Sequence, residues 1–165
     1  MCTKKSVGFV AACMGKRIWP GPVIELGAGG ASKKYKEYFK GYEFITLDLK
    51  AEPDGSTNIV ADILNMPQVK SNSYGVVLLC EVLEHLRDPF KAFKEIARIL
   101  RPGGLFICTT VAAWPLHKHP FDFYRFMPDG LNYLCNVSGL EVIHGVLEPI
   151  TETCGQACCV AAIKK

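Results

Sequence analysis

The chain has 165 residues, of which 49% are hydrophobic and 21% are charged, and these values exclude a disordered protein. Its length predicts a single domain over residues 1–165. The formal net charge of +3 makes nucleic acid an improbable partner, and no apolar run is long enough to cross a membrane. Residues 1–20 form a short N-terminal segment that we do not interpret as a signal peptide, because Lys16 and Arg17 follow its apolar stretch. We therefore expect a cytoplasmic protein.

Short apolar runs alternate with amphipathic stretches along the chain. Strands are predicted at Val23–Leu26, Phe44–Leu47, Ile59–Val60, Val76–Leu79, Leu105–Thr109, Leu140–Leu147 and Cys158–Ile163. A lysine-rich helix is predicted for Ser32–Phe39. A second helix, Pro89–Leu100, has Asp88 as its N-cap and an apolar stripe made of Phe90, Phe93, Ile96, Ala97 and Leu100. This alternation predicts an α/β fold with a mostly parallel sheet.

Two further features of the sequence carry predictions of their own. Pro102-Gly103-Gly104 follows the second helix, and we expect it to end that helix and turn the chain into the next strand. The eight cysteines, at positions 2, 13, 80, 108, 135, 154, 158 and 159, contain no CxxC pair. Three of them cluster at 154–159 without a fourth ligand nearby, so we predict structural thiols and no cysteine metal site.

A glycine-rich turn follows the first predicted strand. The segment Glu25-Leu26-Gly27-Ala28-Gly29 lies where a parallel strand opens into a helix, which is where a nucleotide-like ligand approaches the backbone. Asp48 ends the next strand, 19 residues after Gly29, at the spacing of an acidic side chain that accepts the ribose hydroxyls. A dinucleotide oxidoreductase and a nucleoside-cofactor transferase both fit this pattern. A tight turn followed by a helix-capping aspartate is the structural alternative.

Three further motifs distinguish between these interpretations of the glycine turn and Asp48. They are Ala61-Asp62-Ile63 after the third strand, Cys80-Glu81-Val82-Leu83-Glu84-His85-Leu86 after the fourth, and Leu100-Arg101-Pro102-Gly103-Gly104 before the fifth. This ordered series resembles the class I S-adenosylmethionine-dependent methyltransferases over about residues 20–165. The resemblance implies a Rossmann-like, seven-stranded sheet in the order 3-2-1-4-5-7-6 with strand 7 antiparallel. Dinucleotide dehydrogenases carry neither the Glu84-His85 segment nor the Pro-Gly-Gly turn.

The resemblance also implies a cofactor, S-adenosyl-L-methionine, and the residues that bind it. The methionine part would be lined by Glu25, Gly27, Ala28 and Gly29, the ribose held by Asp48, the adenine flanked by Leu49, Asp62 and Ile63, and the sulfonium floor closed by Cys80 and Glu81. The chain departs from most relatives in two ways, because only about 20 residues precede the first strand and no subdomain follows the fifth. The acceptor must then be enclosed by the N-terminal segment, by the 111–130 loop, or by a partner subunit or second protomer.

The 111–130 loop combines aromatic and charged residues at the edge of the sheet where active sites of open α/β folds lie. We predict that it contacts the acceptor through Trp114, Asp122, Tyr124 and Arg125. The alternative is a packed aromatic loop in which Arg125 pairs with an acid.

Methyl transfer to a hydroxyl group requires that a proton be removed, and we predict His85 and His119 as the catalytic bases, with Glu84 and Asp122 as further candidates. We therefore predict O-methylation of a small molecule. Glu81, Glu84, His85 and a later His119 also resemble the metal-dependent enzymes that methylate the 2′-oxygen of an RNA terminus. Many metal-free relatives share the Glu-His pair, so the expected site contains no metal. A catalytically silent cofactor-binding subunit is the alternative from another class.

Overall fold

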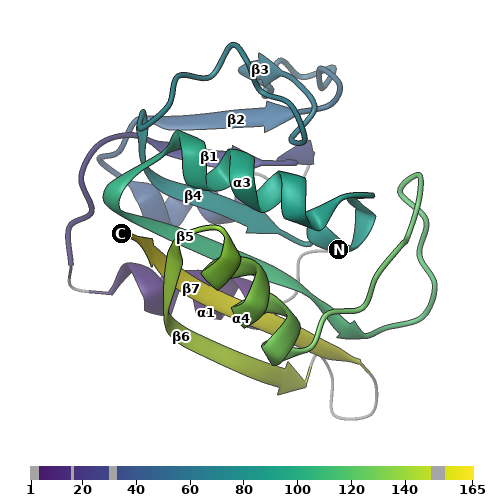
Figure 1. Cartoon of the computed structure of the whole chain (residues 1–165). Coiled ribbons are helices and arrows are strands. Elements are labelled where there is room, and N and C mark those ends of the chain that lie inside the picture. The colour runs from purple at the N-terminus through teal and green to yellow at the C-terminus, as the bar shows by residue number, and fades with distance from the viewer. Residues whose placement is uncertain (1–3, 16, 30–32, 150–154) are drawn as a thin grey trace.

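A seven-stranded sheet forms the centre of the protein, and its order is β3-β2-β1-β4-β5-β7-β6 (Figure 1). The computed structural model describes residues 4–15, 17–29, 33–149 and 155–165. The strands are β1 (Val23–Leu26), β2 (Phe44–Asp48), β3 (Ile59–Val60), β4 (Tyr74–Cys80), β5 (Leu100–Ala113), β6 (Leu140–Pro149) and β7 (Gln156–Lys164). Strands β1 to β5 pair in parallel, whereas β7 is antiparallel to both β5 and β6. The predicted fold and strand order are confirmed.

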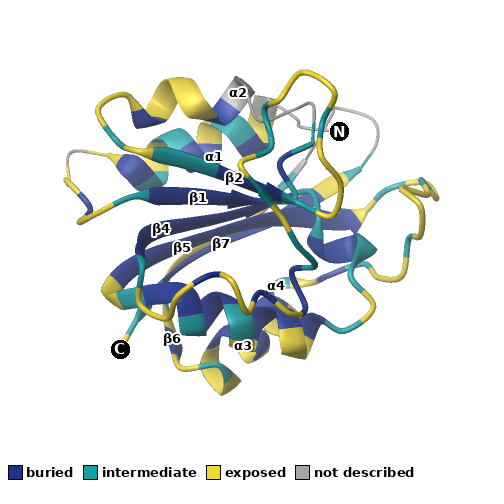
Figure 2. Cartoon of the chain, turned by 90° about the horizontal axis from the view of Figure 1, so that it is seen from above, coloured by how far each residue is buried: buried dark blue, intermediate teal, exposed yellow. Residues whose placement is uncertain are grey.

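Helices cover both faces of the sheet. Figure 2 shows α1 (Lys4–Met14) and α2 (Lys33–Lys36) on one face, and α3 (Pro89–Ile99) and α4 (Pro128–Val137) on the other. A short 3₁₀ turn, η2 (Glu37–Phe39), follows α2 directly. The two layers create two cores, so that Val76 and Leu78 of β4 pack on the α1 side while Val77 and Leu79 pack on the α3 side. Burial on both faces explains why the central strands are continuously apolar.

Helix α3 follows its sequence signals closely. The Asp88 side chain accepts a hydrogen bond from the Lys91 backbone N–H at 2.9 Å, which satisfies one of the free donors of the first turn. Its apolar stripe is buried except for Phe90, which was predicted to face the core but is 47% exposed and packs edge-on against Tyr133 of α4. The helix ends one residue earlier than predicted, because Leu100 already pairs with Tyr74 as the first residue of β5.

The Pro-Gly-Gly segment therefore has a different role from the one predicted. Residues 101–104 lie within β5, between the Leu100–Tyr74 pair and the point where the ladder resumes at Leu105 and Val76. The helix is terminated by strand pairing, and the glycines accommodate the shift in register that follows.

Two helices were not predicted. Helix α1 buries Phe9, Val10 and Met14 against the sheet, and α4 buries Leu131 and Leu134. Strand β5 extends to Ala113 and α4 begins at Pro128, so the irregular connection covers residues 114–127 rather than 111–130. We call this segment the β5–α4 loop. Among the described residues, no helix has the length and apolar character that a membrane span requires.

Six of the eight cysteines lie among the described residues. Cys13, Cys80, Cys108, Cys135, Cys158 and Cys159 are free thiols, and all but Cys13 are buried. Burial raises the pKa of the Cys158 thiol to about 11, so it remains protonated near neutral pH. Cys2 and Cys154 lie outside the described residues, as does Ser32, the first residue of the predicted lysine-rich helix.

Candidate cofactor and acceptor site

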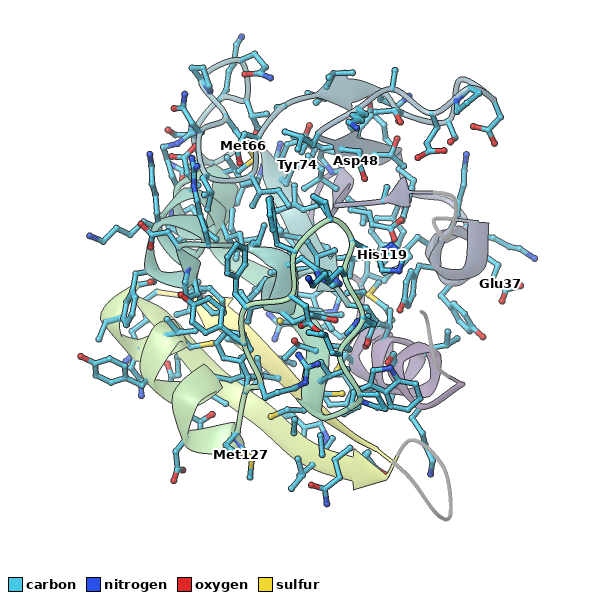
Figure 3. The ribbon with its side chains drawn as sticks, turned by 90° about the vertical axis from the view of Figure 1, so that its right-hand side faces the viewer. Glu37, Asp48, Met66, Tyr74, His119 and Met127 are labelled. Carbon is cyan, nitrogen blue, oxygen red and sulfur yellow. The ribbon has the colours of Figure 1, made fainter. Side chains whose placement is uncertain are left out.

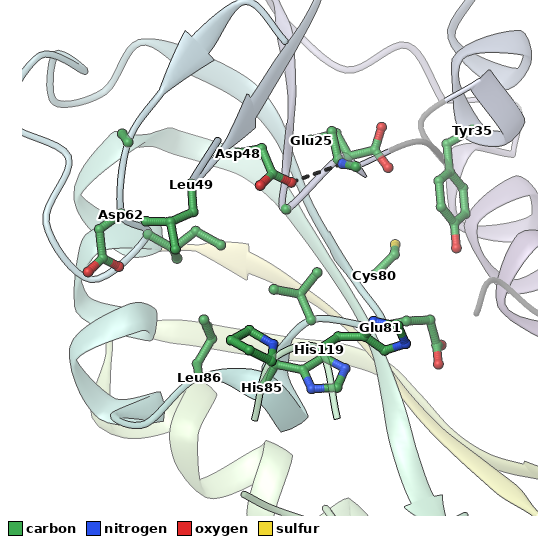
Figure 4. Close-up of a pocket in the computed structure, with 17 residues that line it drawn as sticks. Glu25, Tyr35, Asp48, Leu49, Asp62, Cys80, Glu81, His85, Leu86 and His119 are labelled. Atoms are coloured by element: carbon green, nitrogen blue, oxygen red, sulfur yellow. Dashed lines mark hydrogen bonds between the residues drawn. The ribbon is translucent and has the colours of Figure 1, made fainter. Parts of the chain in front are cut away.

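A cavity of about 440 Å³ lies at the carboxyl ends of β1, β2 and β4 (Figure 4). It is lined by all ten residues predicted to bind the cofactor, which are Glu25, Gly27, Ala28, Gly29, Asp48, Leu49, Asp62, Ile63, Cys80 and Glu81. Both predicted catalytic histidines, His85 and His119, line it as well. Figure 4 shows these histidines across the cavity from Glu25 and Asp48. The topology therefore gathers residues from five separate segments into one site.

The glycine turn after β1 adopts a backbone conformation that favours glycine. Gly27 and Gly29 both have positive φ angles, of 71° and 44°. A Cβ atom on Gly27 would lie 2.5 Å from a methyl carbon of Val82, so this position requires glycine for steric as well as conformational reasons. The Gly29 N–H donates to Asp48 Oδ2 at 3.0 Å, which joins the turn to the end of β2. Sequence reasoning identified both residues but not this bond.

Glu25 lies at the end of β1 and carries a buried carboxyl group. Its side chain is only 3% exposed, and Oε2 has no hydrogen-bond partner in the part of the chain that the structure describes. Burial, together with the nearby Asp48 carboxylate, raises the pKa of Glu25 to about 8. A buried acceptor beside a cavity suits the ammonium group of an amino acid, which would supply the missing donor and charge. Glu25 therefore fits its predicted role beside the methionine part of the cofactor.

Glu81 is held by two hydroxyl groups. Ser6 of α1 donates to Oε1 at 2.8 Å, and Thr109 of β5 donates to the same atom at 2.9 Å. Burial, with the nearby Glu84, raises the pKa of Glu81. The N-terminal segment was predicted to help enclose the site, and Ser6 places α1 in direct contact with one of the lining residues. No sequence pattern pointed to Ser6, because a serine in an unpredicted helix carries no signal of its own.

The β5–α4 loop reaches the cavity through His119 and Pro120. Figure 3 shows His119 at the same edge of the sheet as Asp48, in the loop that follows β5. The loop is attached to η3 (Leu83–His85), because the backbone N–H groups of Phe123 and Tyr124 both donate to the Glu84 carbonyl oxygen, at 2.8 and 3.3 Å. The predicted bases therefore come from two segments that hydrogen bonds hold together.

The residues predicted to contact the acceptor do not line this cavity. Asp122 has a fully buried side chain whose Oδ2 lies 2.7 Å from Nη2 of Arg125, and this cation lowers the pKa of Asp122. Arg125 also donates to the carbonyl oxygen of Trp114 at 3.1 Å, and the Tyr124 hydroxyl donates to the Arg87 carbonyl at 3.1 Å. These groups hold the loop together, which is the arrangement that the packed-loop alternative describes. Their contact with an acceptor stays a prediction.

Several lining residues were not predicted. They are Tyr35 of α2, Ala61, Val82, Leu86 and Pro120. Tyr35 was part of the predicted lysine-rich helix, but the charges around it favoured a solvated face. His117 was also not singled out, although it approaches both Glu84 and Asp122, with ring nitrogens 3.7 and 3.3 Å from their carboxylate oxygens. The signal was present in the His117-Lys118-His119 triplet, but the sequence alone does not say which of its histidines turns inward.

Comparison with known proteins identifies the family. Residues 24–108, just over half of the chain, match the family model described as a methyltransferase domain. The chain therefore belongs to the methyltransferase domain family, which confirms the class I S-adenosylmethionine-dependent methyltransferases predicted from its motifs.

Individual relatives are more distant. The ubiquinone biosynthesis O-methyltransferase of Cereibacter sphaeroides is 28% identical over an alignment that covers 73% of this chain and 60% of that protein. The malonyl-[acyl-carrier protein] O-methyltransferase of Hahella chejuensis is also 28% identical, with 70% of this chain and 45% of that protein covered. The chain thus spans about 60% or less of the length of these two relatives.

Among solved structures, the 1,6-didemethyltoxoflavin-N1-methyltransferase of Burkholderia thailandensis superposes with a TM-score of 0.77. It covers 98% of this chain and 77% of its own, at 16% identity. At this identity the likeness establishes the fold alone, and the acceptor must be inferred from the residues present here.

Proposed function

We propose that the protein transfers the methyl group of S-adenosyl-L-methionine to an oxygen atom of a small molecule. The observation that carries this proposal is the cavity in which the cofactor residues and two histidines face one another. Glu25 would bind the ammonium group of the cofactor, Asp48 its ribose hydroxyls, and Leu49, Asp62 and Ile63 its adenine. The far side of the cavity, at His85 and His119, is then open to the acceptor.

The histidines support an oxygen acceptor in particular. In-line displacement at a methyl group mainly needs alignment, but a hydroxyl acceptor must also lose its proton. His119 is exposed and lines the cavity, so it can take that proton, whereas the Nδ1 atom of His85 already lies 2.5 Å from the Phe121 carbonyl oxygen. His119 is accordingly our first choice for the base. The relatives whose printed names specify O-methyltransferases are consistent with this acceptor atom.

The proposal is tested by incubating the protein with isotopically labelled cofactor and a panel of phenols, catechols, carboxylic acids and short RNAs. Formation of S-adenosylhomocysteine and a labelled O-methyl product is expected with a small hydroxyl or carboxyl compound. His119→Ala should lower turnover while cofactor affinity is kept, and His144→Ala is the matched control, because His144 packs on Phe9 away from the cavity. Labelling of RNA alone would favour the terminal 2′-O-methylation alternative. Cofactor binding with turnover only in the presence of a second protein would favour the silent subunit.

A further inference from the structure

Beside the cavity, three side chains from two segments converge on one point. Glu84 and His85 come from η3 and His117 comes from the β5–α4 loop, and one ligand atom of each lies within 4.8 Å of the other two. Glu84 Oε1 lies 3.8 Å from His85 Nε2 and 3.7 Å from His117 Nε2. The Glu84 side chain is fully buried, and the two histidine side chains are 13% and 18% exposed. None of the three was assigned to the cofactor.

The hydrogen bonds around these rings determine where their protons lie. His85 Nδ1 faces the Phe121 carbonyl oxygen, and His117 Nδ1 lies 3.3 Å from both Asp122 Oδ2 and the Pro115 carbonyl oxygen. Carbonyl and carboxylate oxygens only accept, so in the neutral form of each ring the proton is on Nδ1. The Nε2 atoms then carry lone pairs rather than hydrogens, and both lie within 4 Å of Glu84 Oε1.

Glu84 Oε1 and the two Nε2 atoms thus form a group of three electron-rich atoms. Oε2 of Glu84 accepts a hydrogen bond from Thr110 at 2.7 Å, which fixes the carboxylate, but Oε1 has no hydrogen-bond partner among the described residues. A buried carboxylate oxygen beside two imidazole lone pairs is unfavourable, and either protonation of a ring or a cation between the three atoms relieves it.

We propose that Glu84, His85 and His117 bind one divalent transition-metal ion of the zinc class. The Glu84–His85 and Glu84–His117 separations of 3.8 and 3.7 Å are close to the ~3.4 Å between neighbouring ligands of a tetrahedral ion with bonds of about 2.1 Å, and the two histidine nitrogens lie within 4.8 Å of each other. Two imidazoles and one carboxylate suit Zn²⁺ or Co²⁺ better than Mg²⁺ or Ca²⁺, which prefer oxygen ligands. Three protein ligands leave a further position for water or for an acceptor oxygen.

The surroundings match those of a metal-binding histidine pair. Histidine ligands generally donate their second ring N–H to a carbonyl or carboxylate oxygen, which orients the ring, and Phe121 and Asp122 supply these acceptors here. The ion would join η3 to the β5–α4 loop beside His85, which is part of the cavity wall. It would therefore order the segment that carries His119.

This ligand set differs from the one that the sequence suggested. Glu81 is held by Ser6 and Thr109, and it does not belong to the group of converging ligand atoms. His119 is also outside that group, with its ring centroid 5.9 Å from that of His85 and 6.2 Å from that of His117. The two sets share Glu84 and His85, so variants at Glu81, His117 and His119 separate them.

The experiment measures metal binding by the 165-residue chain after chelator treatment, without cofactor or acceptor. Zn²⁺ is titrated in competition with a chromophoric chelator, and Co²⁺ is added separately to record its visible absorption. We expect the protein to bind one equivalent of either metal, and the bound Co²⁺ to give the intense visible absorption that is typical of four or five ligands. Mg²⁺ at millimolar concentration should not displace the bound Zn²⁺ or Co²⁺. His117→Ala should weaken Zn²⁺ binding at least about 100-fold, because loss of a direct ligand costs more than loss of its supporting partner.

Glu81→Gln and His119→Ala are the matched controls and should bind Zn²⁺ like the wild type. The thermal melting curve of metal-free His117→Ala verifies its fold, and the Co²⁺ spectrum of the wild type tests the site even if that variant fails to fold. Absence of stoichiometric Zn²⁺ binding would overturn the proposal, as would equal binding by His117→Ala. Loss of binding in Glu81→Gln and His119→Ala would also overturn it, in favour of the other ligand set. Because no turnover is measured, failure of the proposed methyl transfer would leave this result unaffected.

Discussion

Replacing Glu25 by glutamine removes a buried ionisable group and should change how the stability of the unliganded protein depends on pH. The pKa of Glu25 is raised from 4.5 to about 8 by burial and by Asp48. Between these values the folded protein binds more protons than the unfolded chain, so its free energy of unfolding falls as the pH rises from about 4.5 to about 8. If fully expressed, the difference in pKa corresponds to ~5 kcal/mol, because one unit is about 1.4 kcal/mol.

Glutamine has nearly the same shape as glutamic acid but does not ionise. Urea denaturation from about pH 5 to about pH 9 should therefore give similar free energies of unfolding for Glu25→Gln and the wild type at the acid end of this range. The variant should become more stable than the wild type by several kcal/mol, on the order of the ~5 kcal/mol limit, above pH 8. Glu37→Gln, at an exposed carboxyl group of η2, is the control and should follow the wild type throughout. Parallel curves for Glu25→Gln and the wild type would refute the reasoning.

The raised pKa of Glu25 should also be measurable as the release of a proton when the cofactor binds. At pH 7 a carboxyl group with a pKa of about 8 is about nine-tenths protonated. The ammonium group of S-adenosylmethionine should return this pKa toward its ordinary value, so that binding releases about 0.9 proton. Titration calorimetry in two buffers of different ionisation enthalpy measures this number. The glutamine variant should release almost none, and an equal release from both proteins would assign the proton to another group.

Three further substitutions test the site and the loop. Asp48→Ala should lower affinity for S-adenosylmethionine by roughly 1.5–3 kcal/mol in calorimetry, because the ribose hydroxyls lose a charged acceptor, and unchanged affinity would exclude this role. Gly27→Ala should lower the free energy of unfolding by at least ~2 kcal/mol, since its Cβ would overlap Val82. The double variant Gly27→Ala/Val82→Ala should regain this loss of stability except for the ~1 kcal/mol cost of the positive φ angle. Arg125→Ala should cost up to about 3 kcal/mol in urea denaturation, because the buried Asp122 would lose its cation and keep only its contacts with His117, whereas Tyr124→Ala should cost less and cofactor affinity should hold in both. Equal stability losses in these last two variants would show that the ion pair is not what holds the loop.

The sequence predicted the sheet accurately because its signals are local. A strand that is covered on both faces is continuously apolar, and all seven predicted strands overlap the observed ones. One side of the cavity was also accessible from the sequence, since Glu25 and Asp48 lie at the ends of β1 and β2, and the glycine turn and Asp62 come just after β1 and β3. In a parallel sheet these carboxyl ends must meet at one edge, so chain order alone brings the residues together.

Helices α1 and α4 were missed for the opposite reason. Their buried positions, such as Phe9 and Val10 in α1 or Leu131 and Leu134 in α4, form stripes too short to stand out from the surrounding loops. Such helices are stabilised mainly by packing on the sheet, which a single sequence does not display. The contact between Ser6 and Glu81 depends on that packing and could not be predicted.

The sequence by itself thus determined the fold, the family and most of the residues that line the cavity. Only the tertiary structure decided the conformation of the β5–α4 loop, in which Asp122 and Arg125 pair with each other and His117, rather than His119, turns toward Glu84. Loop side chains have no periodicity that fixes their direction. Their orientation follows from hydrogen bonds to distant elements, such as those from Phe123 and Tyr124 to the Glu84 carbonyl, and these exist only after the chain has folded.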